Sequence, residues 1–147
     1  MLEQMLLGWQ KLGCPLLVMA GLLLDERTEK LGLQGSAVQL QQVLANLLLN
    51  AADAVEGMPP ARRRITIRMH DEPSGRVQLS VSDAGPGIPA DRLEHVFTPF
   101  FTTKPDGLGL GLSLSRSIIE AHGGRLWAER SPEGGSVLHI VLPGLRP

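Results

Sequence analysis

The sequence predicts an α+β fold, a two-layer α/β sandwich in which helices pack on one face of a mixed β-sheet. Apolar and polar residues alternate in 65–69 and again in 77–83, as they do in strands with one buried face. Helical patterns cover about 37–56 and 112–122. Strands and helices do not follow the strict alternation of a parallel α/β sheet, which favours the α+β class.

Composition narrows the possible functions. The 147 residues are 43% hydrophobic and 20% charged, which suits a single domain, 1–147, with its own core. The net charge of −1 offers no broad basic field, so no nucleic-acid or membrane contact is expected. Cys14 is the single cysteine, which excludes a disulfide framework and suits a cytoplasmic location. The longest apolar run, 15–24, is too short to span a bilayer.

Three short elements are predicted in the first 35 residues. Residues 2–12 have a helical pattern that ends at Gly13. Residues 16–24 are apolar and are predicted to form a strand, although a helix of this length also fits the pattern. Residues 31–34 are predicted to form another short strand.

A long helix is predicted at about 37–56. Ser36 and Gln39 form a capping box at its start, and Gly57 and Pro59 end it. Most of its positions are apolar, so the helix should be largely covered. Its polar residues recur at helical spacing and form one stripe: Gln39, Gln42, Asn46, Asn50 and Asp53.

Two interpretations of this polar stripe stay open. A solvated face would explain the glutamines, but it explains asparagine less well, because asparagine is a poor helix former. Alternatively, the stripe lines a polar cavity. There an amide oxygen would be a suitable ligand for Mg²⁺, and an amide N–H would donate to a phosphate.

The strand at 77–83 ends in an acidic residue on its buried face. Alternation places Asp83 on the same side as Val77, Leu79 and Val81, where an unpaired carboxylate would cost several kcal/mol. The segment 85–87, Gly-Pro-Gly, follows directly. Asp83 either caps its own loop or accepts a hydrogen bond from a buried ligand amine, with the ligand ring against the glycine backbone.

A loop of alternating glycine and leucine precedes the second helix. Its residues are Gly107, Leu108, Gly109, Leu110, Gly111 and Leu112. Free backbone N–H groups and the positive end of a helix together make an anion site, although the spacing fits neither a Walker A loop nor a dinucleotide fingerprint. The helix ends at the pair of glycines 123–124. Two last strands are predicted at 125–130 and 136–143, joined by the turn 132–135.

Five motifs, in this order, resemble the ATP-binding catalytic domain of sensor histidine kinases, within the wider group of Bergerat-fold ATPases. "QLQQVLANLLLNAADAV" is similar to the N box, "DAGPGIP" to the G1 box and "VFTPFFTTK" to the F box. "GLGLGLSLSRSIIEAHGG" is similar to the G2 box, and "GGSVLHIVLP" to the closing strand motif. The resemblance covers about 36–143, whereas residues 1–35 match poorly.

The resemblance implies ATP and Mg²⁺ as cofactors and a role for each matched residue. Asn50 would ligate Mg²⁺, and Asn46 and Lys104 would act at the phosphates as catalytic residues. Asp83 would accept from the adenine amino group. Phe97, Phe100 and Lys104 would belong to a mobile ATP lid. The whole implied binding set is Asn46, Asn50, Asp53, Asp83, Gly85, Gly87, Ile88, Phe97, Phe100, Lys104, Gly107, Leu108, Gly109, Leu110, Gly111 and Leu112.

The resemblance also implies transfer of the γ-phosphoryl group to a histidine on a separate dimerisation domain, and from there to the receiver domain of a response regulator. Related ATPases of this fold use a glutamate general base where this chain has Asn46, and an amide cannot take a proton from water. We therefore expect slow hydrolysis.

The acceptor histidine is not expected within this chain. None of its four histidines, His70, His95, His122 and His139, has the expected acidic neighbour on a helix. The chain is then the catalytic domain of a longer kinase, and it would be the cytosolic part if that sensor is membrane-bound. Two other interpretations stay open: a serine kinase of the anti-sigma type, and a non-catalytic module that senses ATP.

Overall fold

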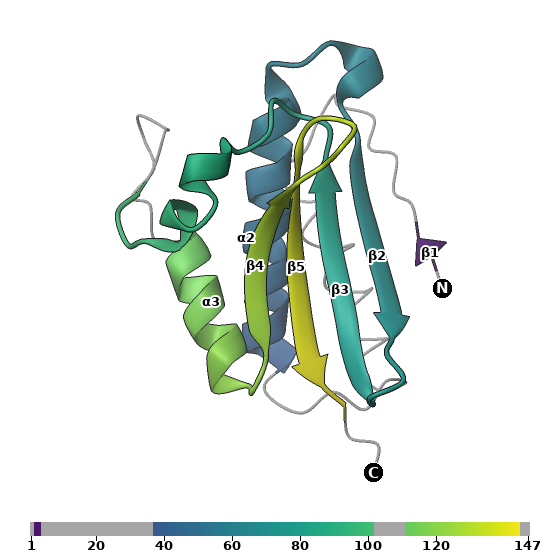
Figure 1. Ribbon diagram of the computed structural model, residues 1–147, viewed down its shortest axis with the longest axis vertical. Coiled ribbons are helices and arrows are strands. Elements are labelled where there is room, and N and C mark those ends of the chain that lie inside the picture. The colour runs from purple at the N-terminus through teal and green to yellow at the C-terminus, as the bar shows by residue number, and fades with distance from the viewer. Residues whose placement is uncertain (1, 4–36, 102–110, 145–147) are drawn as a thin grey trace.

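The computed structural model describes residues 2–3, 37–101 and 111–144 of the chain (Figure 1). Within these residues, two helices, α2 (Ala37–Glu56) and α3 (Gly111–Ala121), accompany five strands. The strands are β1 (Leu2–Glu3), β2 (Ile65–Asp71), β3 (Arg76–Asp83), β4 (Arg125–Arg130) and β5 (Ser136–Pro143). Three short 3₁₀ helices are η1 (Pro60–Arg62), η2 (Ala90–Arg92) and η3 (His95–Phe97). The boundaries predicted for α2, β4 and β5 are confirmed.

The strands form one sheet in the order β1-β2-β3-β5-β4 (Figure 1). Each neighbouring pair is antiparallel. Short turns join β2 to β3 and β4 to β5, and such connections produce antiparallel neighbours. The predicted α+β sandwich is therefore confirmed, but the mixed strand directions expected for its sheet are wrong for the described strands.

One face of the sheet packs against the two helices. Alternate residues of β3, from Val77 to Asp83, are buried, as the sequence pattern predicts. They meet the apolar side of α2, where Val43, Leu47 and Val55 are almost fully buried. In α3, Ile118 and Ile119 complete this core. Helices and inner sheet face thus bury their apolar residues together. Of the described helices, none is long and apolar enough to cross a membrane.

The start of the chain differs from the prediction. A helix was expected over 2–12, but Leu2 and Glu3 form β1 and pair antiparallel with Arg68 and Ile67 of β2. The helix prediction is therefore wrong for these two residues. Among the described residues, this pairing covers the outer edge of β2 at Ile67 and Arg68, where an exposed strand edge would leave backbone groups unpaired. The elements predicted at 4–12, 16–24 and 31–34 lie outside the described residues.

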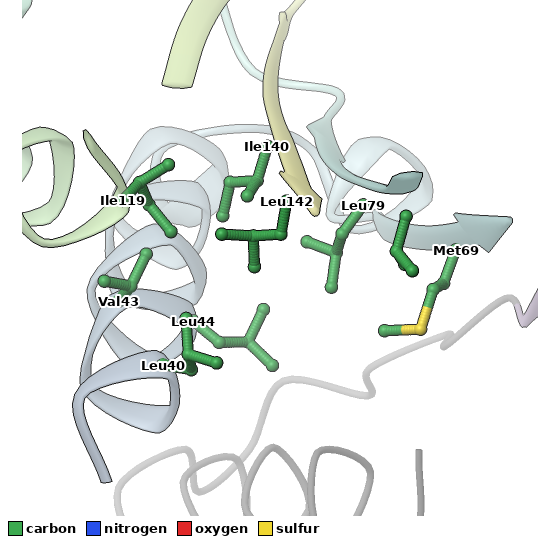
Figure 2. A pocket seen from close by; sticks show the side chains of 9 residues that line it. Leu40, Val43, Leu44, Met69, Leu79, Ile119, Ile140 and Leu142 are labelled. Atoms are coloured by element: carbon green, nitrogen blue, oxygen red, sulfur yellow. The ribbon is translucent and has the colours of Figure 1, made fainter. Parts of the chain in front are cut away.

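An apolar cavity of about 30 Å³ lies between the first half of α2 and the sheet (Figure 2). Its strand residues sit far along the sheet from Asp83, because β3 enters it with Val77 and Leu79. The cavity is lined by Leu40, Val43, Leu44, Met69, Val77, Leu79, Ile119, Ile140 and Leu142. We call this region the apolar end of the domain.

Candidate functional site

The carboxylate of Asp83, the last residue of β3, is the best-defined polar group of the site. Its side chain is only 9% exposed. The Gly85 backbone N–H donates to its Oδ1 at 2.9 Å, and the Ser136 hydroxyl donates to its Oδ2 at 2.7 Å. The bond from Gly85 confirms that Asp83 caps its own loop. Each carboxylate oxygen can accept a further hydrogen bond, so the group also retains the capacity to bind a ligand amine.

Glycines allow three backbone segments to meet around this carboxylate. A Cβ added at Gly85 would lie 2.6 Å from the carbonyl oxygen of Ala54 in α2. Gly87 has a φ of +83°, and its added Cβ would lie 2.9 Å from the carbonyl oxygen of Gly135. Gly135 has a φ of +84°, and an added Cβ there would collide with the Asp83 carbonyl oxygen. Larger residues would separate these segments or strain them.

The polar stripe of α2 reaches the same place. Asn46 and Asn50 are half-buried and Asp53 is exposed. Ala54 follows directly after Asp53 and lies one helical turn beyond Asn50. Because Gly85 packs against Ala54, the loop after Asp83 contacts the end of the stripe. We call this region, formed by Asp83, its loop and the second half of the stripe, the polar end of the domain.

A buried serine joins the stripe to the start of α3. The Asn46 side-chain Nδ2 donates to Ser115 Oγ at 3.2 Å, and Ser115 Oγ donates to the Gly111 carbonyl oxygen at 2.8 Å. Ser115 is 0% exposed. Gly111 is both the first residue of α3 and the last glycine of the predicted anion-binding loop. The structure therefore brings Asn46 and Gly111 together through one hydroxyl group.

Ser115 and Ser136 were missed by the sequence reasoning. Both occupy inward positions: Ser115 precedes Ile118 and Ile119 at helical spacing, and Ser136 alternates with Leu138 on β5. A hydroxyl at a core position needs a hydrogen-bond partner. Each inward serine could have been recognised as a bonded residue from this requirement, but the sequence does not identify its partner.

The remaining residues of the predicted set are in varied surroundings. Ile88 and Leu112 are half-buried against the core. Phe97 is 5% exposed and belongs to the core, and the Arg116 guanidinium lies 4.3 Å from its ring centroid. Phe100 is 73% exposed and has a φ of +67°, which is unusual for a residue with a Cβ. Lys104, Gly107, Leu108, Gly109 and Leu110 lie outside the described residues.

The donor chemistry fits a magnesium nucleotide better than a metal ion held by the protein alone. Among the described residues, no three His, Cys, Asp or Glu side chains are grouped as a metal site. Mg²⁺ in phosphate sites usually takes one or two protein oxygens, with phosphate oxygens and water completing its shell. The asparagine amides of α2 suit that limited role.

The chain is similar to known proteins in both sequence and structure. Residues 35–146 match the family model described as "Histidine kinase-, DNA gyrase B-, and HSP90-like ATPase". The sensor protein FixL of Bradyrhizobium diazoefficiens is 45% identical over 106 residues, which cover 72% of this chain and 21% of FixL. This chain thus spans about a fifth of the length of that relative.

Two solved structures resemble the fold over most of their length. A mycobacterial sensor histidine kinase, MprB, has a TM-score of 0.70 and 30% identity, covering 88% of this chain and 95% of that one. The catalytic domain of the histidine kinase ThkA in a nucleotide-free form has a TM-score of 0.65 and 33% identity, covering 87% of this chain and 90% of that one.

Proposed function

Because this chain belongs to the family of histidine kinase-, DNA gyrase B- and HSP90-like ATPases, we propose that it binds Mg-ATP and donates the γ-phosphoryl group to a histidine. That histidine would lie on a separate dimerisation domain of a sensor kinase in the cytoplasm, and a response regulator would then receive the phosphoryl group. The observation that best supports this proposal is the Asp83 carboxylate, fixed by two hydrogen bonds beside the asparagine stripe.

Asp83 is proposed to recognise adenine. A carboxylate accepts but does not donate hydrogen bonds, so it pairs with the exocyclic amine of adenine and not with the carbonyl oxygen that guanine has at that position. The bonds from Gly85 and Ser136 hold the carboxylate in place before a ligand arrives. A fixed, shielded acceptor discriminates strongly, because the wrong base would leave it without a partner.

The asparagines of α2 are proposed to act on the triphosphate. Asn50 offers an amide oxygen to Mg²⁺, and Asn46 lies one turn earlier, beside the phosphates. Mg²⁺ would neutralise the negative charge that develops on the transferring group. Since the Asn46 amide cannot act as a base toward water, the site favours transfer to another acceptor over hydrolysis. Lys104 and the loop 107–112 would add positive charge and backbone N–H donors.

A histidine acceptor is favoured by the relatives. FixL and MprB are a sensor protein and a sensor histidine kinase, and ThkA is a histidine kinase whose catalytic domain has the size of this chain. FixL is about five times longer than the matched segment, which leaves room for the further domains that a phosphorelay requires. No described feature favours a serine acceptor.

The proposal is tested by mixing the chain with radiolabelled ATP, Mg²⁺ and candidate dimerisation domains. We expect magnesium-dependent, acid-labile phosphate on the dimerisation domain. Asp83→Asn should weaken nucleotide binding by about 10- to 100-fold, because it replaces a charged acceptor with an amide that can place an N–H₂ toward the amine. Isothermal titration measures that loss.

Two outcomes would contradict this proposal. Acid-stable phosphate on a partner would indicate a serine kinase instead. Tight nucleotide binding without transfer to any histidine domain would indicate an ATP sensor. Ser80→Ala serves as the matched control for Asp83→Asn, because Ser80 lies on the same strand but on its outer, half-exposed face.

A further inference from the structure

Ser115 is the most deeply buried polar residue that the proposed function leaves without a role. At 0% exposure it is less accessible than Asp83 or Ser136, the other two buried polar residues of the described chain. It lies where α3 packs against α2, and its hydroxyl contacts both helices. A serine within a helix usually bonds only its own backbone, so the second contact needs an explanation.

The hydroxyl proton of Ser115 determines how the Asn46 amide is oriented. A serine hydroxyl carries one proton, and here it is donated to the Gly111 carbonyl oxygen at 2.8 Å. Ser115 Oγ can therefore only accept from Asn46, which it does from Nδ2 at 3.2 Å. The flipped amide would set Oδ1 against the lone pairs of Oγ and would lose the bond. The amide oxygen of Asn46 is thus directed away from Ser115.

We propose that Ser115 is a positioning residue that holds the Asn46 amide with its oxygen free to act on the nucleotide phosphates or their magnesium ion. This inference rests on the proposed function, because it assigns an orientation to a residue of the same site. The Ser115 hydroxyl also links Gly111, the first residue of α3, to the stripe of α2.

The same helix contains a natural control. Ser117 Oγ donates to the Ser113 carbonyl oxygen at 3.1 Å, which is the same bond to the preceding turn that Ser115 makes. Ser117 is exposed, and its side-chain hydrogen bond stays within α3. Ser115→Ala and Ser117→Ala therefore remove the same local bond from α3, but only the first removes the contact with Asn46.

The orientation of the Asn46 side-chain amide is tested first, in the absence of nucleotide. In the ¹⁵N–¹H spectrum of the chain, the side-chain amide signals of Asn46 should exchange slowly with water and should shift in Ser115→Ala. They should stay unchanged in Ser117→Ala. An Asn46 signal that does not respond to Ser115→Ala would overturn the inference, whatever the chain binds. Circular dichroism confirms that both variants remain folded.

The effect of the Asn46 orientation on phosphoryl transfer is tested in the transfer assay. Ser115→Ala should lower the rate at saturating Mg-ATP by about 3- to 10-fold, the value of one hydrogen bond, with a smaller change in KM. In an Asn46→Ala background the same substitution should have no effect, because the group it orients is gone. Equal effects in both backgrounds would overturn the inference. If wild-type chain binds Mg-ATP but transfers nothing, the proposed function fails, and the spectral test still decides the orientation.

Discussion

The apolar end and the polar end of the domain are built from the same helix and the same strands, but their side chains differ in chemistry. At the apolar end, Leu40 and Leu44 of α2 face Leu79 and Leu142 across a cavity of about 30 Å³. At the polar end, the same helix presents asparagines, and the same strand β3 presents Asp83. One end has apolar groups with space between them, and the other has polar groups that are bonded to one another.

This difference distinguishes the residues that stabilise the domain from the residues that can bind a ligand. Leucine side chains have no group that could orient a polar ligand, and their burial stabilises the fold. Asp83 and Ser136 cost free energy to bury, and their mutual hydrogen bond offsets that cost. We therefore expect substitutions at the apolar end to change stability and substitutions at the polar end to change nucleotide affinity.

The largest effect is expected for Leu44→Ala at the apolar end. Leu44 is 3% exposed, and removing its side chain would enlarge a cavity that already exists. The free energy of unfolding should fall by about 2–5 kcal/mol, as it does for other buried leucines. Urea unfolding followed by circular dichroism measures the loss, while titration at low temperature should show an unchanged affinity for Mg-ATP.

Leu49→Ala is the control for this stability effect. Leu49 lies on the same helix but is 43% exposed, so its truncation should change the free energy of unfolding by about 0.5 kcal/mol or less. If Leu44→Ala weakened nucleotide binding in the folded chain as strongly as Asp83→Asn does, the separation of the two ends would be incorrect.

An intermediate effect is expected for Asn50→Asp at the polar end. The change adds a negative charge where we place the triphosphate, and two like charges in partly hydrated surroundings repel by about 1–4 kcal/mol. Mg-ATP affinity or transfer rate should fall by about tenfold or more. The free energy of unfolding should change much less than in Leu44→Ala, because Asn50 is only half-buried. Titration and transfer assays with the folded variant measure these effects.

Gln42→Glu is the matched charge control. It adds the same charge to the same stripe, eight residues earlier, at an exposed position. Eight helical residues span about 12 Å, which exceeds the distance over which salt screens charges at physiological ionic strength. Equal losses for Gln42→Glu and Asn50→Asp would indicate a diffuse charge effect. Unchanged affinity and transfer in Asn50→Asp would show that Asn50 does not contact the nucleotide.

The sequence predicts elements and faces well because these depend on local periodicity. The limits of α2 follow from its helical apolar pattern and from Gly57, and the inward position of Asp83 follows from strand alternation. Its partners could not be predicted in the same way. Ser136 lies 53 residues from Asp83, and Ser115 lies 69 residues from Asn46, so each pair depends on how the layers assemble.

The predictions of a mixed sheet and of helix at Leu2 and Glu3 are wrong for a related reason. Strand direction is set by which strands become neighbours, and β3 lies beside β5, a pairing between segments far apart in sequence. Residues 2–12 have a helical sequence pattern, but the backbone of Leu2 and Glu3 pairs with β2 instead. Such contacts outweigh local propensity over short segments.

The smallest effect is expected for a polar contact that faces water. Arg116 of α3 stacks on Phe97 with its guanidinium 4.3 Å from the ring centroid, and it lies 3.3 Å from a carboxylate oxygen of Glu94. Its side chain is 28% exposed and that of Glu94 is 77% exposed, so water and salt screen the ion pair. Arg116→Gln should lower the free energy of unfolding by about 0.5–1 kcal/mol, mainly through the lost stacking.

Glu94→Gln, which leaves that stacking intact, should have a smaller effect. Arg116 also lies 3.7 Å from a carboxylate oxygen of Glu120. Urea unfolding at low and high salt separates the stacking from these two ion pairs, which salt weakens more. A loss in Arg116→Gln as large as that of Leu44→Ala would show that polar contacts need not be buried to stabilise this fold, contrary to the distinction between the two ends.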